Sequence, residues 1–173
     1  MPPFNNFTTK AKEAVRRAHE LAIERGQNHV SPLHLLAALV LQEESLVFSM
    51  LDRMEVDTNL LADAILEHLE APESASVLSP SYQIYLTPDL AQALEASGKI
   101  AARLNDTFVG TEHLFLAVIE HPGPANDLFA RFSIGRASLT TMVRVPTLAL
   151  LSFSMAVTAS ASLTISTKPK PFD

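Results

Sequence analysis

The sequence has no cysteine, no tryptophan and only five glycines among its 173 residues. Without cysteine the chain can form neither a disulfide framework nor a thiolate metal site, and it has no thiol nucleophile. The five glycines never approach the Gly-x-x-x-x-Gly-Lys-Ser/Thr spacing of a phosphate-binding loop, which excludes nucleotide hydrolysis by that route. Positive charge is also scarce: the net charge is −6, and proteins that bind nucleic acid need clustered lysine and arginine.

Other catalytic and targeting motifs are missing as well. There is no Gly-x-Ser-x-Gly nucleophile elbow and no His-Glu-x-x-His zinc motif, and His29 and His34 are wrongly spaced for two ligands on one helix face. The residues after Met1 lack the basic and apolar segments of a secretory signal. We therefore expect a cytoplasmic protein without enzymatic activity, metal or cofactor. The alternative is an enzyme whose residues come together only in the fold.

What the chain does contain is a duplication. Residues 30–40, VSPLHLLAALV, recur as residues 109–119, VGTEHLFLAVI, at a shift of 109 − 30 = 79. The same shift places Thr8 on Thr87, and no gap is needed between Thr8 and Leu41. Self-similarity at a fixed offset indicates repeated structural units that bury their apolar faces against each other. The length suits one domain or two half-size units, and an apolar content of 47% is ample for a core.

The first two helices of the first unit have clear start and stop signals. A helix is predicted over residues 7–25, with Thr8 as its N-cap and Gly26 as a left-handed stop. Its apolar residues recur on a single helical face. Ser31 and Pro32 then start a helix that runs to about residue 42 and is apolar nearly all round, which predicts a buried helix.

Two shorter helices complete the first unit, residues 7–70. They are predicted over residues 46–54 and 58–69, and Asp57 caps the second of them. Residues 71–86 are rich in Ser and Pro and are predicted to form a linker. The residues expected to face inward from the two short helices are Leu46, Val47, Met50, Leu51, Leu60, Leu61, Ala64, Ile65 and Leu69.

The second unit, residues 87–143, is expected to repeat the first. Thr87 and Pro88 open a helix that ends near Arg103, and Asn105 takes the stop position of Gly26. The buried helix is repeated over 111–119 and the third helix over 125–132, and a fourth helix begins at Ser138. The predicted fold is all-α: two four-helix units that form one eight-helix, pseudo-twofold domain over residues 1–143.

Residues 144–173 break this pattern. Residues 145–167 carry no charge and no glycine, yet nine of these positions are Ser or Thr. Their length is enough to span a bilayer, whereas the Ser/Thr content and Pro146 make them a poor membrane helix. Three alternatives stay open: a completed fourth helix followed by an irregular tail, a membrane span, and a short aggregation-prone strand.

Five stretches of the duplicated unit match a known family: Phe7-Thr8, Gly26-x-x-x-Val30, Pro32-Leu33-His34-Leu35-Leu36, Leu86-Thr87-Pro88 and Val109-Gly110-Thr111-Glu112-His113-Leu114. Through them the duplicated unit resembles the amino-terminal Clp repeat domain of Clp ATPases, most closely the ClpC and ClpB types. The resemblance implies an eight-helix domain, tethered to an ATPase ring, that recruits substrates and adaptor proteins and does no chemistry itself. The ATPase modules are missing from this sequence, and residues 144–173 do not resemble the family's link to the ring.

In ClpC-like members the resemblance implies a site at the helix starts, where a threonine and a glutamate hold a phosphoarginine tag. Free amides at a helix start suit the phosphate, and a carboxylate suits the guanidinium group. The matching positions are Thr87 and Glu112 in the second repeat and Thr8 and Leu33 in the first. Because Leu33 has no carboxylate, we expect polar recognition only where Glu112 lies. The alternative is that both threonines are N-caps and nothing more.

His34 and His113 occupy the same place in the two repeats, which raises the question of a catalytic or metal role. The competing interpretation is structural: a buried imidazole that bonds to the backbone of the turn and holds the start of the helix. We favour this interpretation for all the residues at the two helix starts, which are Ser31, Pro32, His34, Thr111 and His113.

The leading functional prediction is a protein-interaction module that recruits substrates or adaptors to a Clp-type AAA+ unfoldase. The expected partners are unfolded or tagged proteins, adaptor proteins and a full-length Clp ATPase, rather than nucleic acid or a membrane. Three alternatives are a membrane-tethered form anchored by residues 145–167, a free-standing regulator that competes for Clp adaptors, and an inactive fragment of a Clp ATPase subunit.

Overall fold

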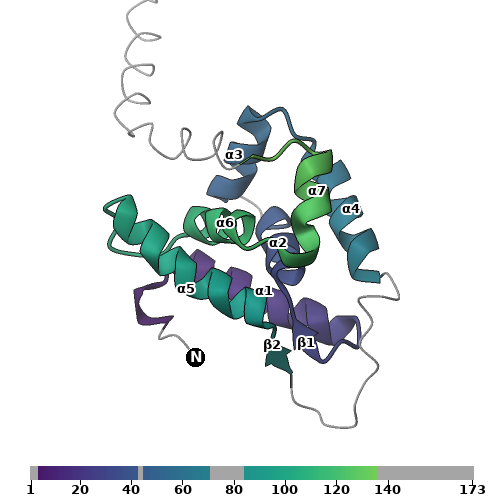
Figure 1. Ribbon diagram of the computed structural model, residues 1–173, viewed down its shortest axis with the longest axis horizontal. Coiled ribbons are helices and arrows are strands. Elements are labelled where there is room, and N and C mark those ends of the chain that lie inside the picture. The colour runs from purple at the N-terminus through teal and green to yellow at the C-terminus, as the bar shows by residue number, and fades with distance from the viewer. Residues whose placement is uncertain (1–3, 43–44, 71–83, 136–173) are drawn as a thin grey trace, which may run out of the picture.

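The computed structural model describes residues 4–42, 45–70 and 84–135 (Figure 1). These residues form seven α-helices, two short 3-10 helices and one two-stranded sheet. The all-α prediction is confirmed. The eighth helix, expected from Ser138, and the whole of residues 144–173 lie outside the described residues, so the domain boundary at 143 stays a prediction.

The first helices begin and end where the caps and stops predict. After a 3-10 turn (η1, Phe4–Asn6), α1 spans Thr9–Glu24, and the Thr8 hydroxyl accepts a hydrogen bond from the Ala11 amide at 3.2 Å. Gly26 adopts a φ of 65°, a conformation that costs glycine little. α2 (Pro32–Val40) follows Ser31, and each of its residues is buried, as its apolar sequence predicts.

The two short helices of the first repeat are α3 (Leu46–Arg53) and α4 (Thr58–Glu70). Asp57 Oδ1 caps α4 by accepting from the amides of Asn59 and Leu60. The prediction that Leu46 and Leu60 face inward is wrong, because their side chains are 57% and 59% exposed. Each lies in the first turn of its helix. A helical period identifies the apolar face, but it does not show where along that face the neighbouring helix ends.

In the described residues, the second repeat has counterparts of α1, α2 and α3 in the same order. It contains α5 (Pro88–Arg103), α6 (Thr111–Glu120), a 3-10 turn (η2, Gly123–Ala125) and α7 (Asn126–Arg131). The Thr87 hydroxyl accepts from the Leu90 amide at 3.3 Å, as Thr8 does from Ala11 in the first repeat. Asn105 has a φ of 62° and matches Gly26 at the shift of 79. The duplication therefore extends to backbone conformation.

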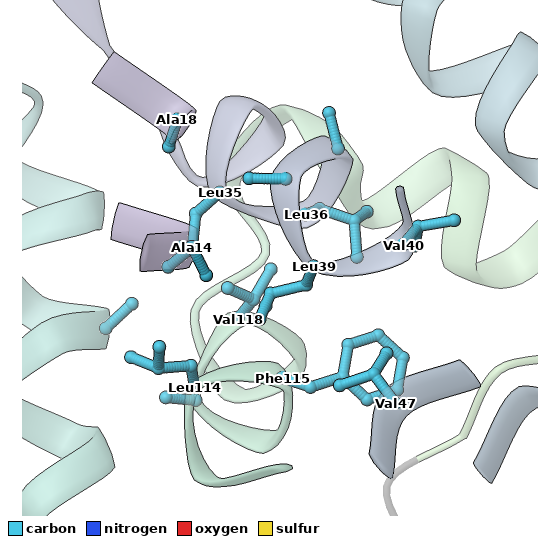
Figure 2. Packing of buried hydrophobic residues seen from close by; sticks show 14 of the residues in the cluster. Ala14, Ala18, Leu35, Leu36, Leu39, Val40, Val47, Leu114, Phe115 and Val118 are labelled. Carbon is cyan, nitrogen blue, oxygen red and sulfur yellow. The ribbon is translucent and has the colours of Figure 1, made fainter. Parts of the chain in front are cut away.

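The core joins the two repeats through their buried central helices. In Figure 2, Leu35, Leu36 and Leu39 of α2 lie opposite Leu114, Phe115 and Val118 of α6. The two sets are equivalent at the shift of 79. All six side chains belong to one continuous apolar cluster that also takes in residues of α1, α3, α4, α5 and α7. The repeats therefore share one core rather than forming two independent domains.

Short backbone pairings relate the repeats by a pseudo-twofold axis. β1 (His29–Val30) pairs in parallel with β2 (Tyr85–Leu86), and Phe7 forms an isolated parallel bridge with Val109. Adding 79 to Phe7 gives Leu86, and subtracting 79 from Val109 gives Val30. The Leu86–Val30 pair is therefore the Phe7–Val109 pair with the two repeats exchanged. The sequence did not predict these pairings: Tyr85 and Leu86, assigned to the linker, form β2, because a two-residue strand has no periodicity and depends on a distant partner.

None of the helices in the described ranges combines the length and the apolar character needed to cross a bilayer. The candidate span over residues 145–167 lies outside those ranges.

Candidate binding site

The parallel pairings bring each capping threonine to the start of a helix in the other repeat. The Thr8 amide donates to the Val109 carbonyl at 2.9 Å, directly before α6. The Thr87 amide donates to the Val30 carbonyl at 2.9 Å, directly before α2. We call the first place the α1–α6 corner, defined by Thr8, Val109, Gly110 and Glu112. The second is the α5–α2 corner, defined by Thr87, Val30, Ser31 and Leu33.

This geometry corrects the predicted pairing of site residues. The sequence grouped Thr87 with Glu112 and Thr8 with Leu33, because each pair belongs to one repeat. The backbone bonds instead bring Thr8 to the segment that carries Glu112, and Thr87 to the segment that carries Leu33. The two threonines still cap their own helices. Each corner is therefore built from both repeats.

The α1–α6 corner combines a helix start with a carboxylate. The Glu112 side chain is 18% exposed, and its Oε1 lies 3.4 Å from His113 Nδ1. The carboxylate folds back over Gly110, where a Cβ atom would collide with it. Glycine at position 110 therefore allows the carboxylate to approach the N-cap. The first turn of α1 contains no acidic residue and carries Lys10, so its charge favours an anion.

The α5–α2 corner lacks these features. Leu33 is only 2% exposed and belongs to the apolar core, so it offers no polar group to a ligand. The first turn of α5 contains Asp89, whose negative charge opposes the binding of an anion at that helix start. Only the α1–α6 corner presents both a carboxylate and a helix start free of acidic side chains.

The two histidines are parts of the scaffold beneath these corners. Nδ1 of His34 accepts from the Ser31 amide at 3.2 Å, and Nδ1 of His113 accepts from the Gly110 amide at 2.9 Å. Each imidazole thus satisfies an amide that a helix start leaves without a partner. Both side chains are 1% exposed, which hides them from ligands. The remaining helix-start residues, Ser31, Pro32 and Thr111, are also buried.

The surroundings of the two imidazoles differ. His113 Nε2 lies 3.1 Å from Asp106 Oδ2. His34 Nε2 has no hydrogen-bond partner among the described residues. Burial lowers the pKa of His34 to about 4, and the positive charges of His29 and Arg25 act in the same direction. In the described part of the chain, no cluster of three or more His, Cys, Asp or Glu side chains is arranged to hold a metal ion.

Comparison with known proteins finds relatives among Clp-type chaperones and their N-terminal domains. The chaperone ClpB of Bacillus cereus is 32% identical over 138 residues, which cover 78% of this chain and 16% of ClpB. The N-terminal domain of Hsp104 from Candida albicans superposes with a TM-score of 0.69 at 23% identity, covering 80% of this chain and 89% of that domain. A ClpV N-domain solved in complex with a VipB peptide superposes with a TM-score of 0.64 at 19% identity, covering 79% of this chain and 83% of that one.

The chain spans about one sixth of the length of the curated ClpB relatives that it matches. The sequence profile of the Clp repeat (R) N-terminal domain matches residues 6–132, which include both repeats as far as α7. This chain therefore belongs to the Clp repeat N-terminal domain family.

Proposed function

We propose that this chain is a protein-interaction module that recruits unfolded or tagged proteins, or adaptor proteins, to a Clp-type AAA+ unfoldase. The observation that carries the proposal is the match of residues 6–132 to the Clp repeat N-terminal domain, which is one part of much longer Clp proteins. The ClpV N-domain with a bound VipB peptide supports a peptide as the kind of ligand. In this proposal the domain binds and does no chemistry of its own.

The α1–α6 corner is the proposed recognition site, and its chemistry suits a phosphoarginine side chain. The phosphate would lie at the start of α1, where the amides and the helix dipole attract an anion. The guanidinium group would pair with the Glu112 carboxylate, which accepts bidentate hydrogen bonds. Phosphoarginine carries a phosphate and a guanidinium group on one side chain. The α1–α6 corner offers a partner for each of them, the start of α1 for the phosphate and Glu112 for the guanidinium group.

The α5–α2 corner should contribute little to such binding. Leu33 cannot pair with a guanidinium group, and Asp89 would repel a phosphate. The proposal therefore specifies one site per chain, formed by Thr8 of the first repeat and Glu112 of the second.

The test measures the affinity of the full chain for one peptide in three forms, carrying phosphoarginine, arginine or phosphoserine, by isothermal titration calorimetry. The phosphoarginine peptide should bind most tightly, because only it offers both charges at the right separation. Glu112→Gln should weaken its binding by about 10- to 100-fold, the value of a charge-assisted hydrogen bond. The matched control is Glu67→Gln on the exposed face of α4, which should change nothing.

Two results would overturn different parts of the proposal. Equal binding of all three peptides, or a Glu112→Gln variant with unchanged affinity, would reject the phosphoarginine site but not the interaction module. If the chain also failed to bind a permanently unfolded polypeptide, a ClpC-type adaptor protein and a full-length Clp ATPase subunit, the recruitment function itself would be rejected.

A further inference from the structure

An open apolar groove lies in the first repeat, away from both corners. It has a volume of about 410 Å³ and is formed by the end of α2, by α3 and by the first turns of α4. Its apolar lining consists of Val40, Leu41, Phe48 and Ala62, and the uncharged polar residues of the lining are Gln42, Thr58 and Asn59. Grooves of this size and composition are typical of sites that take a few apolar side chains.

The helices that border the groove carry several exposed apolar side chains. Leu41 and Phe48 are 45% and 46% exposed. Leu46 and Leu60, the two residues expected to face inward, begin the helices that border the groove, and both are largely exposed. Leu41 and Phe48, which line the groove, are large apolar side chains open to solvent, and such surfaces mark interaction sites.

The helices around the groove are strongly acidic. Residues 45–70 contain six carboxylates and one arginine, which gives 1 − 6 = −5. The equivalent stretch of the second repeat, residues 124–149, contains one aspartate and three arginines, which gives 3 − 1 = +2. Asp57 and Asp63 directly neighbour the groove residues Thr58 and Ala62 in sequence, and both are exposed. The occupant of the groove should therefore be apolar and flanked by positive charge.

The chain itself contains a segment with these properties. Residues 145–167 are uncharged, and their most apolar stretch is Leu148–Phe153, LALLSF. This segment is flanked by Arg144 on one side and by Lys168 and Lys170 on the other. Residues 136–173 contain four basic residues and one acidic residue, a net charge of 4 − 1 = +3. The sign of this charge is opposite to that of α3 and α4.

We propose that Leu148–Phe153 docks into the α2–α3–α4 groove of its own chain, with the flanking basic residues near the acidic faces of α3 and α4. The described chain ends at Gly135, shortly after α7, which contacts α4. The twelve residues 136–147 can span up to about 40 Å, and they follow directly on the part of the chain where α7 contacts α4, one of the groove helices. A tether of this length holds a segment at millimolar effective concentration, so weak contacts suffice. The inference does not depend on the proposed recruitment function.

The absence of native cysteine makes a cross-linking test specific. A full-length variant with Ser49→Cys, next to Phe48 on the exposed side of α3, is combined with Ser154→Cys, next to the docking stretch. The control pairs Ser154→Cys with Gln92→Cys, which is exposed on α5 in the other repeat. The rate of intramolecular disulfide formation under mild oxidation should be about tenfold higher for the Ser49→Cys pair, corresponding to docking worth about 1.4 kcal/mol.

Two further variants test whether the groove causes this difference. Phe48→Ser should reduce the rate of the Ser49→Cys pair to that of the control, whereas Phe108→Ser, at another exposed phenylalanine, should leave it unchanged. Raising the salt concentration should lower the rate, because it screens the attraction between opposite charges. Equal rates for the two cysteine pairs, insensitivity to Phe48→Ser, or disulfide-linked dimers as the main product would overturn the proposal, the last by identifying a second copy as the occupant.

Discussion

Acid should destabilise this protein through one buried imidazole. His34 is 1% exposed, and burial lowers its pKa from 6.5 to about 4, with the positive charges of His29 and Arg25 acting in the same direction. In the unfolded chain this imidazole takes up a proton near pH 6.5, whereas in the folded chain it does so only near pH 4. Between these values the unfolded state binds more protons. The free energy of unfolding is therefore highest above pH 6.5 and falls as the pH drops through this window.

The magnitude follows from the two pKa values. Their difference is 6.5 − 4 = 2.5, and each pKa unit corresponds to about 1.36 kcal/mol. His34 alone should therefore remove roughly 3 kcal/mol of stability once the pH is below 4, and roughly 2 kcal/mol of this by pH 5. The total free energy of unfolding of a small domain is about 5–15 kcal/mol. The loss is large enough to measure while the protein is still folded.

The assay is urea unfolding of the full chain at pH 7.5 and pH 5. Glutamine is the informative replacement, because in His34→Gln the side-chain oxygen can still accept from the Ser31 amide but cannot bind a proton. The wild type should lose about 2 kcal/mol more than His34→Gln between the two pH values. His19→Gln, at an exposed position on α1, serves as the matched control and should behave like the wild type.

Two observations would refute this reasoning. One is a His34→Gln variant whose stability falls with pH as steeply as that of the wild type. The other is an NMR titration of the folded chain in which the His34 ring takes up a proton near pH 6.5, since that would mean that burial does not suppress its charge.

Three further perturbations test other parts of the structure. Thr8→Ala removes the hydroxyl that caps α1 and should lower the free energy of unfolding by about 1 kcal/mol, measured by urea denaturation. Leu36→Ala opens a cavity where α2 meets α6 and should cost about 3–5 kcal/mol in the same assay, so a loss below 1 kcal/mol would contradict the shared core. Gly110→Ser should displace the Glu112 carboxylate and weaken phosphoarginine-peptide binding severalfold in calorimetry, with little change in stability because the displaced group is a flexible side chain.

Much of the fold could be predicted because its signals are local. An N-cap threonine acts on amides two or three residues away, and a left-handed stop acts on the turn in which it lies, so Thr8, Thr87, Gly26 and Asn105 all have the predicted positions. The burial of α2 followed from its apolar sequence. Leu46 and Leu60 were assigned wrongly because their exposure depends on where a neighbouring helix ends, which is a property of the packed molecule.

The site was harder to predict for a related reason. The residues at the helix starts were identified from sequence, but their grouping was not. Thr8 lies at the start of α6 because its neighbour Phe7 forms a parallel bridge with Val109, which is 109 − 7 = 102 residues away in the chain. No local pattern specifies such a pairing. A duplicated sequence could have suggested it, because two equivalent units that share a core must exchange some contacts across the pseudo-twofold axis.

Two sequence differences between the repeats distinguish the two corners and the surroundings of the two imidazoles. At the shift of 79, Gln27 is equivalent to Asp106 and Leu33 to Glu112, so both carboxylates near a buried imidazole belong to the second repeat. His113 Nε2 lies 3.1 Å from Asp106 Oδ2, whereas the residue at the equivalent position of the first repeat is Gln27, which has no carboxylate. Leu33 offers no partner for a guanidinium group, and the pKa of His34 is lowered by burial, with no carboxylate at position 27 to offset it. We therefore expect a guanidinium group to pair only at the α1–α6 corner, which carries Glu112, and we expect the acid sensitivity to arise at His34, whose pKa burial lowers.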